Sequence, residues 1–263
     1  MTPALEIDVL TTFVAGYLSW ARKSRVYGTF LPVISYRGHA SQDWLLLPSL
    51  CRQKLPVTFL QQFEKDVIQE FRNRFDLSGW TDIDVLAYAR HHGAPTRLLD
   101  WSQNPFVGLW FAVSDKDYDS KNGVVFQLDL IAPGPLICPA TALTLEHADK
   151  CRPVHIFASP HRVARSARQR SAFTITSFSE DYALQPLDHL GAQDAKLPIR
   201  RFDIPAGLKL HLRRLLSDVG LDPYTIYGDP DSFGEMLSNH LDFSGLKVVD
   251  KTRGSTGAET PPA

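Results

Sequence analysis

Residues 88–112 read YARHHGAPTRLLDWSQNPFVGLWFA and place polar and ionisable residues between two segments with helical patterns. The first helix is expected over about residues 82–92, where apolar residues recur at helical spacing. Thr81 or Asp82 is suited to cap its start, and Gly93 is typical of the position just after a helix end. The stretch therefore predicts a helix that stops abruptly before a polar segment.

His91 and His92 fall in the last turn of this expected helix. The carbonyl end of a helix favours positive charge, so at least one imidazole is expected to hold its proton more tightly than a free histidine. Adjacent helical residues point about 100° apart, which disfavours a metal ion shared by the pair. The sequence therefore predicts no metal site.

A short connector follows, in which Pro95 forbids helix and the next helix begins at Asn104 with a proline after it. Leu98 and Leu99 are expected to anchor this connector to the core. A pinned loop that holds Thr96, Arg97 and Asp100 beside a helix N-terminus would bind an anion through backbone N–H groups and a guanidinium. The alternative is that Arg97 and Asp100 pair with each other and brace a buried turn.

Upstream, residues 30–39 read FLPVISYRGH, which predicts a strand with a β-branched centre. Tyr36, Arg37, Gly38 and His39 stand in succession at its end. A glycine at this position would let the backbone approach a ligand closely. We therefore include Tyr36, Arg37 and Gly38 among the candidate binding residues.

The remaining segments complete an α+β pattern. Strands are expected over residues 124–130, 154–158, 171–177 and 197–204, with Gln169 at the entrance of the third, and helices over 5–21, 58–75, 206–219 and 231–241. In the helix over 58–75 the charged residues, Glu64 among them, are expected on a solvated face. The predicted fold is a mixed or antiparallel sheet, in one or two parts, surrounded by helices from both termini.

Composition limits the classes of protein to consider. The 263 residues carry a net charge of −1 and are 44% hydrophobic, enough for one good core, so we expect a single domain over residues 1–250 and a disordered tail over 251–263. The chain has no apolar run of membrane-spanning length and no signal-peptide pattern, which predicts a cytoplasmic location without a membrane partner. The three cysteines are far apart and are expected to be reduced and structural.

A basic segment over residues 161–170 carries four arginines and no acid: Arg162, Arg165, Arg168 and Arg170. Such a segment would neutralise the phosphates of a nucleic-acid partner, although a basic loop is often only a solvated surface.

Taken together, these motifs resemble those of FRG-domain proteins, a family named for an aromatic-Arg-Gly motif. The resemblance rests on Tyr36-Arg37-Gly38, on the His91–Trp101 block with Asn104-Pro105 and Phe111-Ala112, on Arg168-Gln169 with Phe173, and on the segment over residues 216–231. It covers about residues 33–241. The family's usual Gln-x-Gly is Gln169-Arg-Ser here, a departure that puts in question a tight backbone turn at this point.

The arrangement is also similar to that of split-sheet ADP-ribosyltransferases. This similarity implies that the protein uses NAD as a substrate. In that interpretation Arg37, between Tyr36 and Gly38, binds pyrophosphate or ribose. Thr96 and Arg97 hold phosphate, with Asn104 at the following helix, and His91 or His92 binds a ribose hydroxyl. These roles are what the resemblance implies.

Cleavage of the nicotinamide bond of NAD builds positive charge on the ribose, which an ionised carboxylate would stabilise. Many such transferases use a late Gln-x-Glu, and this sequence has none. We therefore assign the role to Asp100, with Glu235 in reserve, His92 as a further catalytic candidate and Gln169 to orient a nucleophile. The missing glutamate favours a nucleic-acid base as acceptor, or binding of nucleotide alone.

The resemblance to bacterial and phage proteins implies a toxin or phage-defence function, with an antitoxin or other protein as a partner. Two other classes stay open. A metal-independent nuclease or phosphodiesterase would use His91 or His92 as general acid or base, with Arg37 and Arg97 stabilising the phosphorane. A non-catalytic nucleotide-binding interaction module would use the same polar residues to brace its core.

Overall fold

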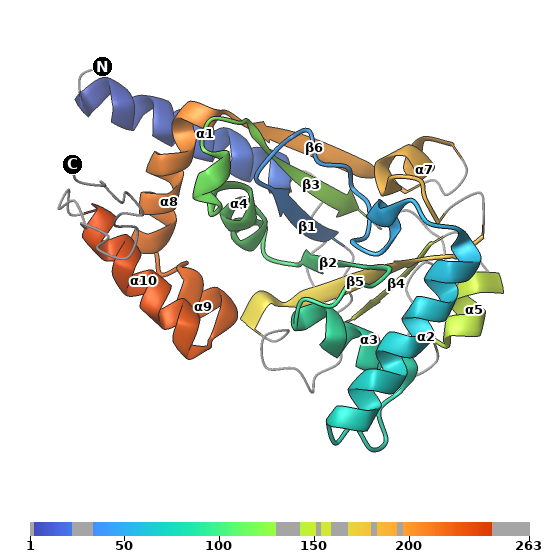
Figure 1. Cartoon of the computed structure of the whole chain (residues 1–263). Coiled ribbons are helices and arrows are strands. Elements are labelled where there is room, and N and C mark those ends of the chain that lie inside the picture. The colour runs from blue at the N-terminus through green and yellow to red at the C-terminus, as the bar shows by residue number, and fades with distance from the viewer. Residues whose placement is uncertain are drawn as a thin grey trace, which may run out of the picture.

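The computed structural model describes residues 3–22, 34–129, 143–150, 154–158, 168–179, 183–193 and 197–243. Its helices and strands are drawn in Figure 1. The helices are α1 (Pro3–Arg22), α2 (Val57–Arg74), α3 (Asp82–His91), α4 (Pro105–Val113), α5 (Leu145–Lys150), α7 (Leu187–Gln193), α8 (Lys209–Asp218), α9 (Pro223–Tyr227) and α10 (Pro230–Phe243). The strands are β1 (Ile34–His39), β2 (Leu98–Ser102), β3 (Gly123–Asp129), β4 (Val154–Ala158), β5 (Ser171–Thr176) and β6 (Ile199–Ile204).

The six strands form one sheet in the order β4-β5-β2-β1-β3-β6, and every neighbouring pair is antiparallel. The α+β prediction is therefore confirmed, and of its two forms the antiparallel one is present. The ladders are long on both sides of the centre, whereas β1 and β2 are paired at one position, Tyr36 opposite Ser102. This junction between β1 and β2 divides the sheet into two halves, and we call it the central seam.

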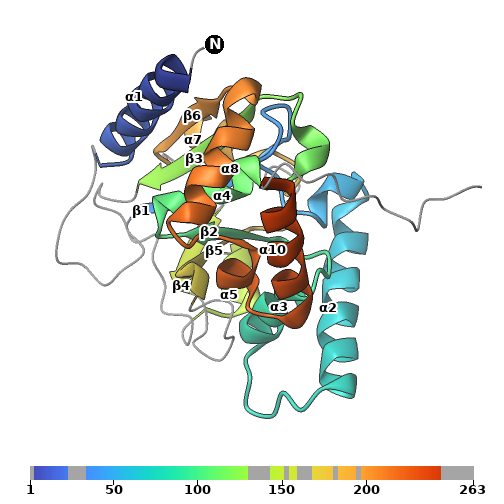
Figure 2. The same cartoon turned by 90° about the vertical axis from the view of Figure 1, so that its left-hand side faces the viewer.

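Two groups of helices cover the same face of the sheet. Over β1 and β3, α1, α4 and α8 pack in one apolar cluster that includes Tyr36 and Val125. Over β2, β5 and β4, α2, α3 and α5 pack in another that includes Leu98 and Phe173. The opposite face carries Leu99, Trp101 and Phe126 against α7 and the segment around Leu46. Figure 1 shows the two helix groups toward opposite ends of the sheet, and Figure 2 shows α8 and α10 at the end that faces the viewer.

Helix α4 lies unusually close to β1. A Cβ atom built on Gly38 would be 2.0 Å from the carbonyl oxygen of Gly108 and 2.6 Å from the backbone nitrogen of Ala112. A Cβ on Gly108 would in turn be 2.9 Å from the Cβ of Tyr36. The space beside Gly38, where a ligand was expected, is therefore occupied by the backbone of α4, and this close contact fixes the helix against the seam.

The helix boundaries predicted around the central stretch are confirmed. Thr81 caps α3 in a reciprocal capping box with Asp84, and Gly93 follows the helix with a φ of 85°. The side chain of Asn104 accepts from the N–H of Phe106 at the start of α4. Sequence and structure agree here because capping residues act locally.

The connector between these helices was predicted as a loop, and this prediction was wrong. Residues Leu98–Ser102 form β2, which lies between β5 and β1 in the middle of the sheet. Because helices and loops cover both faces of this strand, the adjacent Leu98 and Leu99 are both buried and the strand has no alternation of apolar and polar residues. Residues 43–50 make turns before a short 3-10 helix at Cys51–Gln53.

Within the described ranges, no helix has the length and apolar character needed to cross a bilayer. The expected tail over residues 251–263 lies outside the part of the chain that is described.

Candidate functional site

A cavity of about 360 Å³ opens at the central seam. Its walls come from β1, β2, α3 and the ends of α4 and α9, so it lies between the two helix groups. The ionisable and amide side chains that line it are Arg37, His39, Arg52, Arg90, Asp100, Asp115 and Gln169; the aromatic ones are Tyr36, Trp44, Trp101, Phe111 and Tyr227.

The seam itself explains why a charged side chain enters the sheet here. If the ladder continued beyond Tyr36 and Ser102, Gly38 would lie opposite Asp100. Instead, Nη1 of Arg37 donates to the carbonyl oxygen of Asp100 at 2.7 Å. A guanidinium therefore satisfies a strand carbonyl that the backbone of β1 leaves free.

Asp100 is the carboxylate at the centre of the cavity, and 30% of its side chain is exposed. Its Oδ2 accepts from Nη1 of Arg37 at 3.1 Å, and its Oδ1 accepts from Nε of Arg90 at 2.7 Å. Burial alone would raise the pKa of Asp100, but the charges of Arg90 and Arg37 outweigh it and hold this pKa well below its usual range. Asp100 is therefore ionised at neutral pH.

His39 fixes the other edge of the Arg37 guanidinium. Nε of Arg37 donates to Nε2 of His39 at 3.1 Å, and Nδ1 of His39 lies 3.3 Å from the carbonyl oxygen of Trp44. Burial first, and then the charge of Arg37, lower the pKa of His39 to about 3. The imidazole is thus neutral, with its proton on Nδ1 toward Trp44, and it serves as an acceptor for Arg37.

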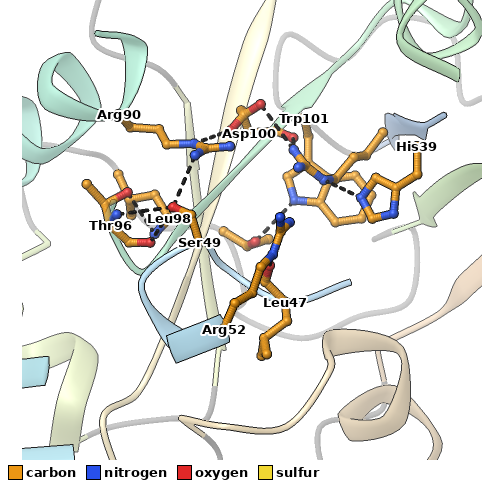
Figure 3. A network of polar contacts seen from close by, with 11 residues as sticks. His39, Leu47, Ser49, Arg52, Arg90, Thr96, Leu98, Asp100 and Trp101 are labelled. Carbon is orange, nitrogen blue, oxygen red and sulfur yellow. Dashed lines mark hydrogen bonds and ion pairs between the residues drawn. The ribbon is translucent and has the colours of Figure 1, made fainter. Parts of the chain in front are cut away.

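Two more arginines complete the charged wall. Nη1 of Arg90 donates to Ser49 at 3.2 Å, and Nε of Arg52 donates to the carbonyl oxygen of Leu47 at 3.0 Å. Figure 3 shows Arg52 and Arg90 extending from different elements toward the space beside Asp100. Burial lowers the pKa of Arg52 and of Arg37 from the ordinary value of an arginine, yet both stay charged near neutral pH.

The wall keeps donors for a ligand. Within the described part of the chain, no hydrogen-bond partner is found for Nη2 of Arg37, for Nη2 of Arg90 or for either terminal nitrogen of Arg52. Three guanidinium groups face one central carboxylate, with a second carboxylate, Asp115, on an exposed residue of the lining. The site is therefore suited to an anion that accepts several charge-assisted hydrogen bonds.

Aromatic rings also line the cavity that holds this charged centre. Trp44 packs edge-on against Tyr118 with ring centroids 4.7 Å apart. Phe111 and Tyr227 meet with centroids 6.3 Å apart. Planar groups on both ends of an anionic ligand would find apolar surfaces there.

Five of the eleven predicted site residues line this cavity: Tyr36, Arg37, Gly38, Asp100 and Gln169. The hydroxyl of Tyr36 is turned toward the core, where it donates to the carbonyl oxygen of Ala21 at 2.8 Å. The side-chain amide of Gln169 donates to the carbonyl oxygen of Ile226 at 3.3 Å, and the backbone carbonyl oxygen of Gln169 accepts from the hydroxyl of Ser102 at 2.6 Å. Arg37 and Asp100 therefore present the charged groups of this predicted set.

Arg97 lies elsewhere, in a buried ion cluster. It is 1% exposed, its Nε is 3.0 Å from Oε2 of Glu64, its Nη1 donates to Asp149, and its guanidinium lies 4.3 Å from the ring centroid of Phe178. The alternative in which Arg97 pairs with Asp100 is therefore wrong. Residues three apart around a strand point to opposite faces, so these two side chains diverge.

Glu64 corrects a second expectation. It was placed on a solvated helix face, yet it is 3% exposed and faces Arg97. Leu60, Glu64 and Ile68 are the buried residues of α2, whereas Phe59 of the same helix is largely exposed. Burial raises the pKa of Glu64 to about 7, against the lowering effect of Arg97.

The other predicted residues do not line the cavity at the seam. Thr96 is buried, and its hydroxyl accepts from the N–H of Leu98 at 3.3 Å. The rings of His91 and His92 pack near Phe173 and Tyr88 at the end of α3. Asn104 caps α4, and Glu235 lies on α10 beside a pocket of about 20 Å³.

Of the basic segment, Arg168 and Arg170 are described, whereas Arg162 and Arg165 lie outside the described residues. The guanidinium of Arg168 lies 5.8 Å from the ring centroid of Tyr224. Arg170 has a φ of 46°, so the chain does make a tight left-handed turn just before β5. The turn questioned from the Gln169-Arg-Ser sequence is therefore present, and Arg170 makes it.

Sequence reasoning missed Arg52 and Arg90 as members of the site. Arg90 lies within the stretch quoted above. It falls in the last turn of the expected helix, where a basic residue is common and does not indicate a site. Arg52 follows a turn that no periodic pattern marks. Had Asp100 been assigned to a strand between two helix ends, a cation from α3 would have been the expected partner.

No curated protein and no solved structure matches the chain. Residues 33–121 match the family model described as the FRG domain, a span that contains β1, α3, β2 and α4 and therefore Arg37, Arg52, Arg90 and Asp100. The resemblance found in the sequence is confirmed for this span, and the residues that match the FRG domain model supply the charged wall of the cavity.

Proposed function

We propose that the cavity at the seam binds NAD and that the protein transfers ADP-ribose from it to an acceptor. The observation that carries the proposal is the ionised Asp100 held by Arg37 and Arg90 in an open cavity with unused guanidinium donors. A polar set that only braced a core would be sealed from solvent and fully paired. This set is open on one side and has donors to spare.

Charge supports a pyrophosphate as the central group of the ligand. Arg37, Arg52 and Arg90 exceed the charge of Asp100 by two, or by one when the exposed Asp115 of the lining is counted as well, and a pyrophosphate bridging two nucleosides carries two negative charges. The aromatic residues of the lining, Trp44, Phe111 and Tyr227 among them, would contact the adenine and nicotinamide rings. A dinucleotide therefore suits the cavity better than a single small anion.

The proposed reaction breaks the bond between the ribose C1′ and the nicotinamide nitrogen. Nicotinamide leaves neutral with the bonding electron pair, positive charge develops on the ribose, and the acceptor nucleophile bonds to C1′ and loses its proton. Once the pyrophosphate offsets the excess guanidinium charge, the carboxylate of Asp100 stabilises the developing cation. Gln169, on the same wall, would orient the acceptor.

The nuclease alternative is less well supported. It requires His91 or His92 beside the arginines, and both lie outside the cavity. His39 is the histidine among the described lining residues, and it is neutral with both ring nitrogens facing hydrogen-bond partners. A general acid or base for phosphodiester cleavage is therefore not provided by a histidine of this wall.

The test is to measure NAD binding by calorimetry and nicotinamide release by chromatography for the wild type and for Asp100→Asn. Asparagine keeps the size of the side chain and an acceptor oxygen but removes the charge. We expect NAD to bind at least as tightly, because the cavity becomes more positive, while nicotinamide release falls by about 100-fold or more. Asp218→Asn, on an exposed residue of α8, is the matched control and should leave both quantities unchanged.

Arg90→Gln tests the binding half of the proposal and should weaken NAD binding by about tenfold or more while the protein stays folded in thermal melts. The proposal fails if the wild type neither binds NAD nor releases nicotinamide in the presence of RNA, DNA or cell lysate. It also fails if Asp100→Asn releases nicotinamide at the wild-type rate.

A further inference from the structure

A second cavity, of about 390 Å³, lies at the start of α4. Leu18, Ala21, Pro105 and Phe106 give it an apolar floor, and Gln103 and Asn104 add amide groups. Arg22, at the end of α1, and Arg170, at the turn before β5, bring two guanidinium groups to it from distant parts of the sequence. We call this the α4 cavity.

The charge of the α4 cavity is uncompensated. Its described lining contains two arginines and no acidic residue, and neither Arg22 nor Arg170 forms an ion pair or hydrogen bond through its side chain with a described residue. The backbone N–H groups at the start of α4 are already paired, since Phe106 donates to the side chain of Asn104 and Val107 donates to the carbonyl oxygen of Asn104. The two guanidinium groups are the available donors.

The α4 cavity is a neighbour of the cavity at the seam. Ser102 donates to the carbonyl oxygen of Gln169, and both residues line the cavity at the seam. The next residue on each segment, Gln103 and Arg170, lines the α4 cavity, and the N–H of Gln103 donates to the carbonyl oxygen of Arg170 at 3.1 Å. The wall between the two cavities is therefore only these two hydrogen-bonded segments thick.

We propose that the α4 cavity binds one nucleotide of a single-stranded nucleic acid. The apolar floor with the ring of Phe106 would receive the base, and Arg22 and Arg170 would bind the flanking phosphates, the combination by which such strands are held without sequence preference. This inference deepens the proposed function and in part rests on it. A strand seated here would present a neighbouring base at the wall that carries Gln169, where the acceptor is required.

The test uses fluorescence anisotropy with end-labelled single-stranded RNA and DNA of about 12 nucleotides, the upper part of the range that one such domain covers. Arg22→Gln and Arg170→Gln should each weaken binding about three- to tenfold and lower the salt slope of log K by about 0.7. Phe106→Leu should weaken binding about threefold or more without changing the salt slope. Arg74→Gln, an exposed arginine of α2, is the charge-matched control and should change neither quantity.

Unchanged affinity in both arginine variants, or an equal loss in Arg74→Gln, would overturn the inference. So would equal binding of polyglutamate, because a strand held by this site needs a base as well as charge. Nicotinamide release without nucleic acid separates the two proposals. Turnover with no binding of oligonucleotide would refute the α4 cavity alone, and variant-sensitive oligonucleotide binding without turnover would refute the transferase alone.

Discussion

One terminal nitrogen of Arg37 donates to two oxygens of Asp100, the carbonyl at 2.7 Å and the carboxylate at 3.1 Å. A single side chain thus replaces a backbone ladder and holds the central charge of the cavity. Its third contact, from Nε to His39, fixes the plane of the guanidinium.

Arg37→Lys should lose stability although it keeps the charge. A lysine ammonium has no second edge, so it cannot contact His39 and both oxygens of Asp100 together. We expect the free energy of unfolding, from urea melts at pH 7, to fall by about 1–3 kcal/mol. Arg201→Lys, at an exposed arginine that pairs with Asp203 along β6, should change it by less than about 0.5 kcal/mol. Equal losses in the two variants would contradict this role of Arg37.

The buried, neutral state of His39 predicts a dependence of stability on pH. Its pKa is about 3 in the folded protein against an ordinary 6.5, so its contribution is complete above pH 6.5 and is lost as the pH falls toward the folded value. The advantage of the wild type over His39→Gln should therefore shrink between pH 6.5 and about pH 4, by up to about 1.4 kcal/mol per pH unit. Urea melts across this range measure it. A difference between the two proteins that stays constant over this range would contradict the buried, neutral state of His39.

Glu64 predicts a trend of opposite sign. Its pKa is raised to about 7 from 4.5, so its contribution is present below pH 4.5 and is lost as the pH rises toward 7. Glu64→Gln should gain on the wild type over this interval, by on the order of 1–3 kcal/mol, because a buried charge is removed while Asp149 still pairs with Arg97. Glu70→Gln, exposed on the same helix, is the control. A constant difference between pH 5 and pH 8 would show that Glu64 is not protonated on folding.

Gly38→Ala should be strongly destabilising because the added Cβ would be 2.0 Å from the carbonyl oxygen of Gly108. The obstacle is the backbone of α4, so relief requires the whole helix to move, and we expect a loss of about 3 kcal/mol or more. Gly16→Ala is the matched control, since nothing lies within 4 Å of a Cβ there. In mid-helix it should stabilise by about 0.5–1 kcal/mol. Similar melting temperatures for the two variants would rule out the close packing of α4 on β1.

The parts of the fold predicted from sequence are those specified locally. The ends of α3 and α4 follow from Thr81, Gly93 and Asn104, residues that act on their own helix. β2 was missed because a strand covered on both faces has neither alternation nor helical period. Because β2 was not predicted as a strand, the sequence also did not indicate that the side chains of Arg97 and Asp100 point in opposite directions.

The site was predicted less completely because it is assembled across the seam. Arg37 and Asp100 were recognised, since each stands beside a glycine or in a dense motif. Arg52 and Arg90 reach Asp100 only through the packing of α3 and of the turn around Ser49, which no single segment encodes. Glu64 was misplaced because apolar residues flank the buried positions of α2 on both sides. The hydrophobic pattern alone therefore favoured the wrong face of the helix as the buried one.

Because β1 and β2 are paired through the backbone at one position, the two halves of the sheet are held together in an unusual way. In a sheet whose ladder is continuous, the connection between strands is made by peptide groups, which neither titrate nor compete with dissolved ions. Here part of that connection is made by Arg37, Asp100 and Arg90. The cohesion of the two halves is therefore sensitive to acid, to ionic strength and to any solute that exchanges for a carboxylate, so that the middle of the fold itself senses the composition of the solution around it.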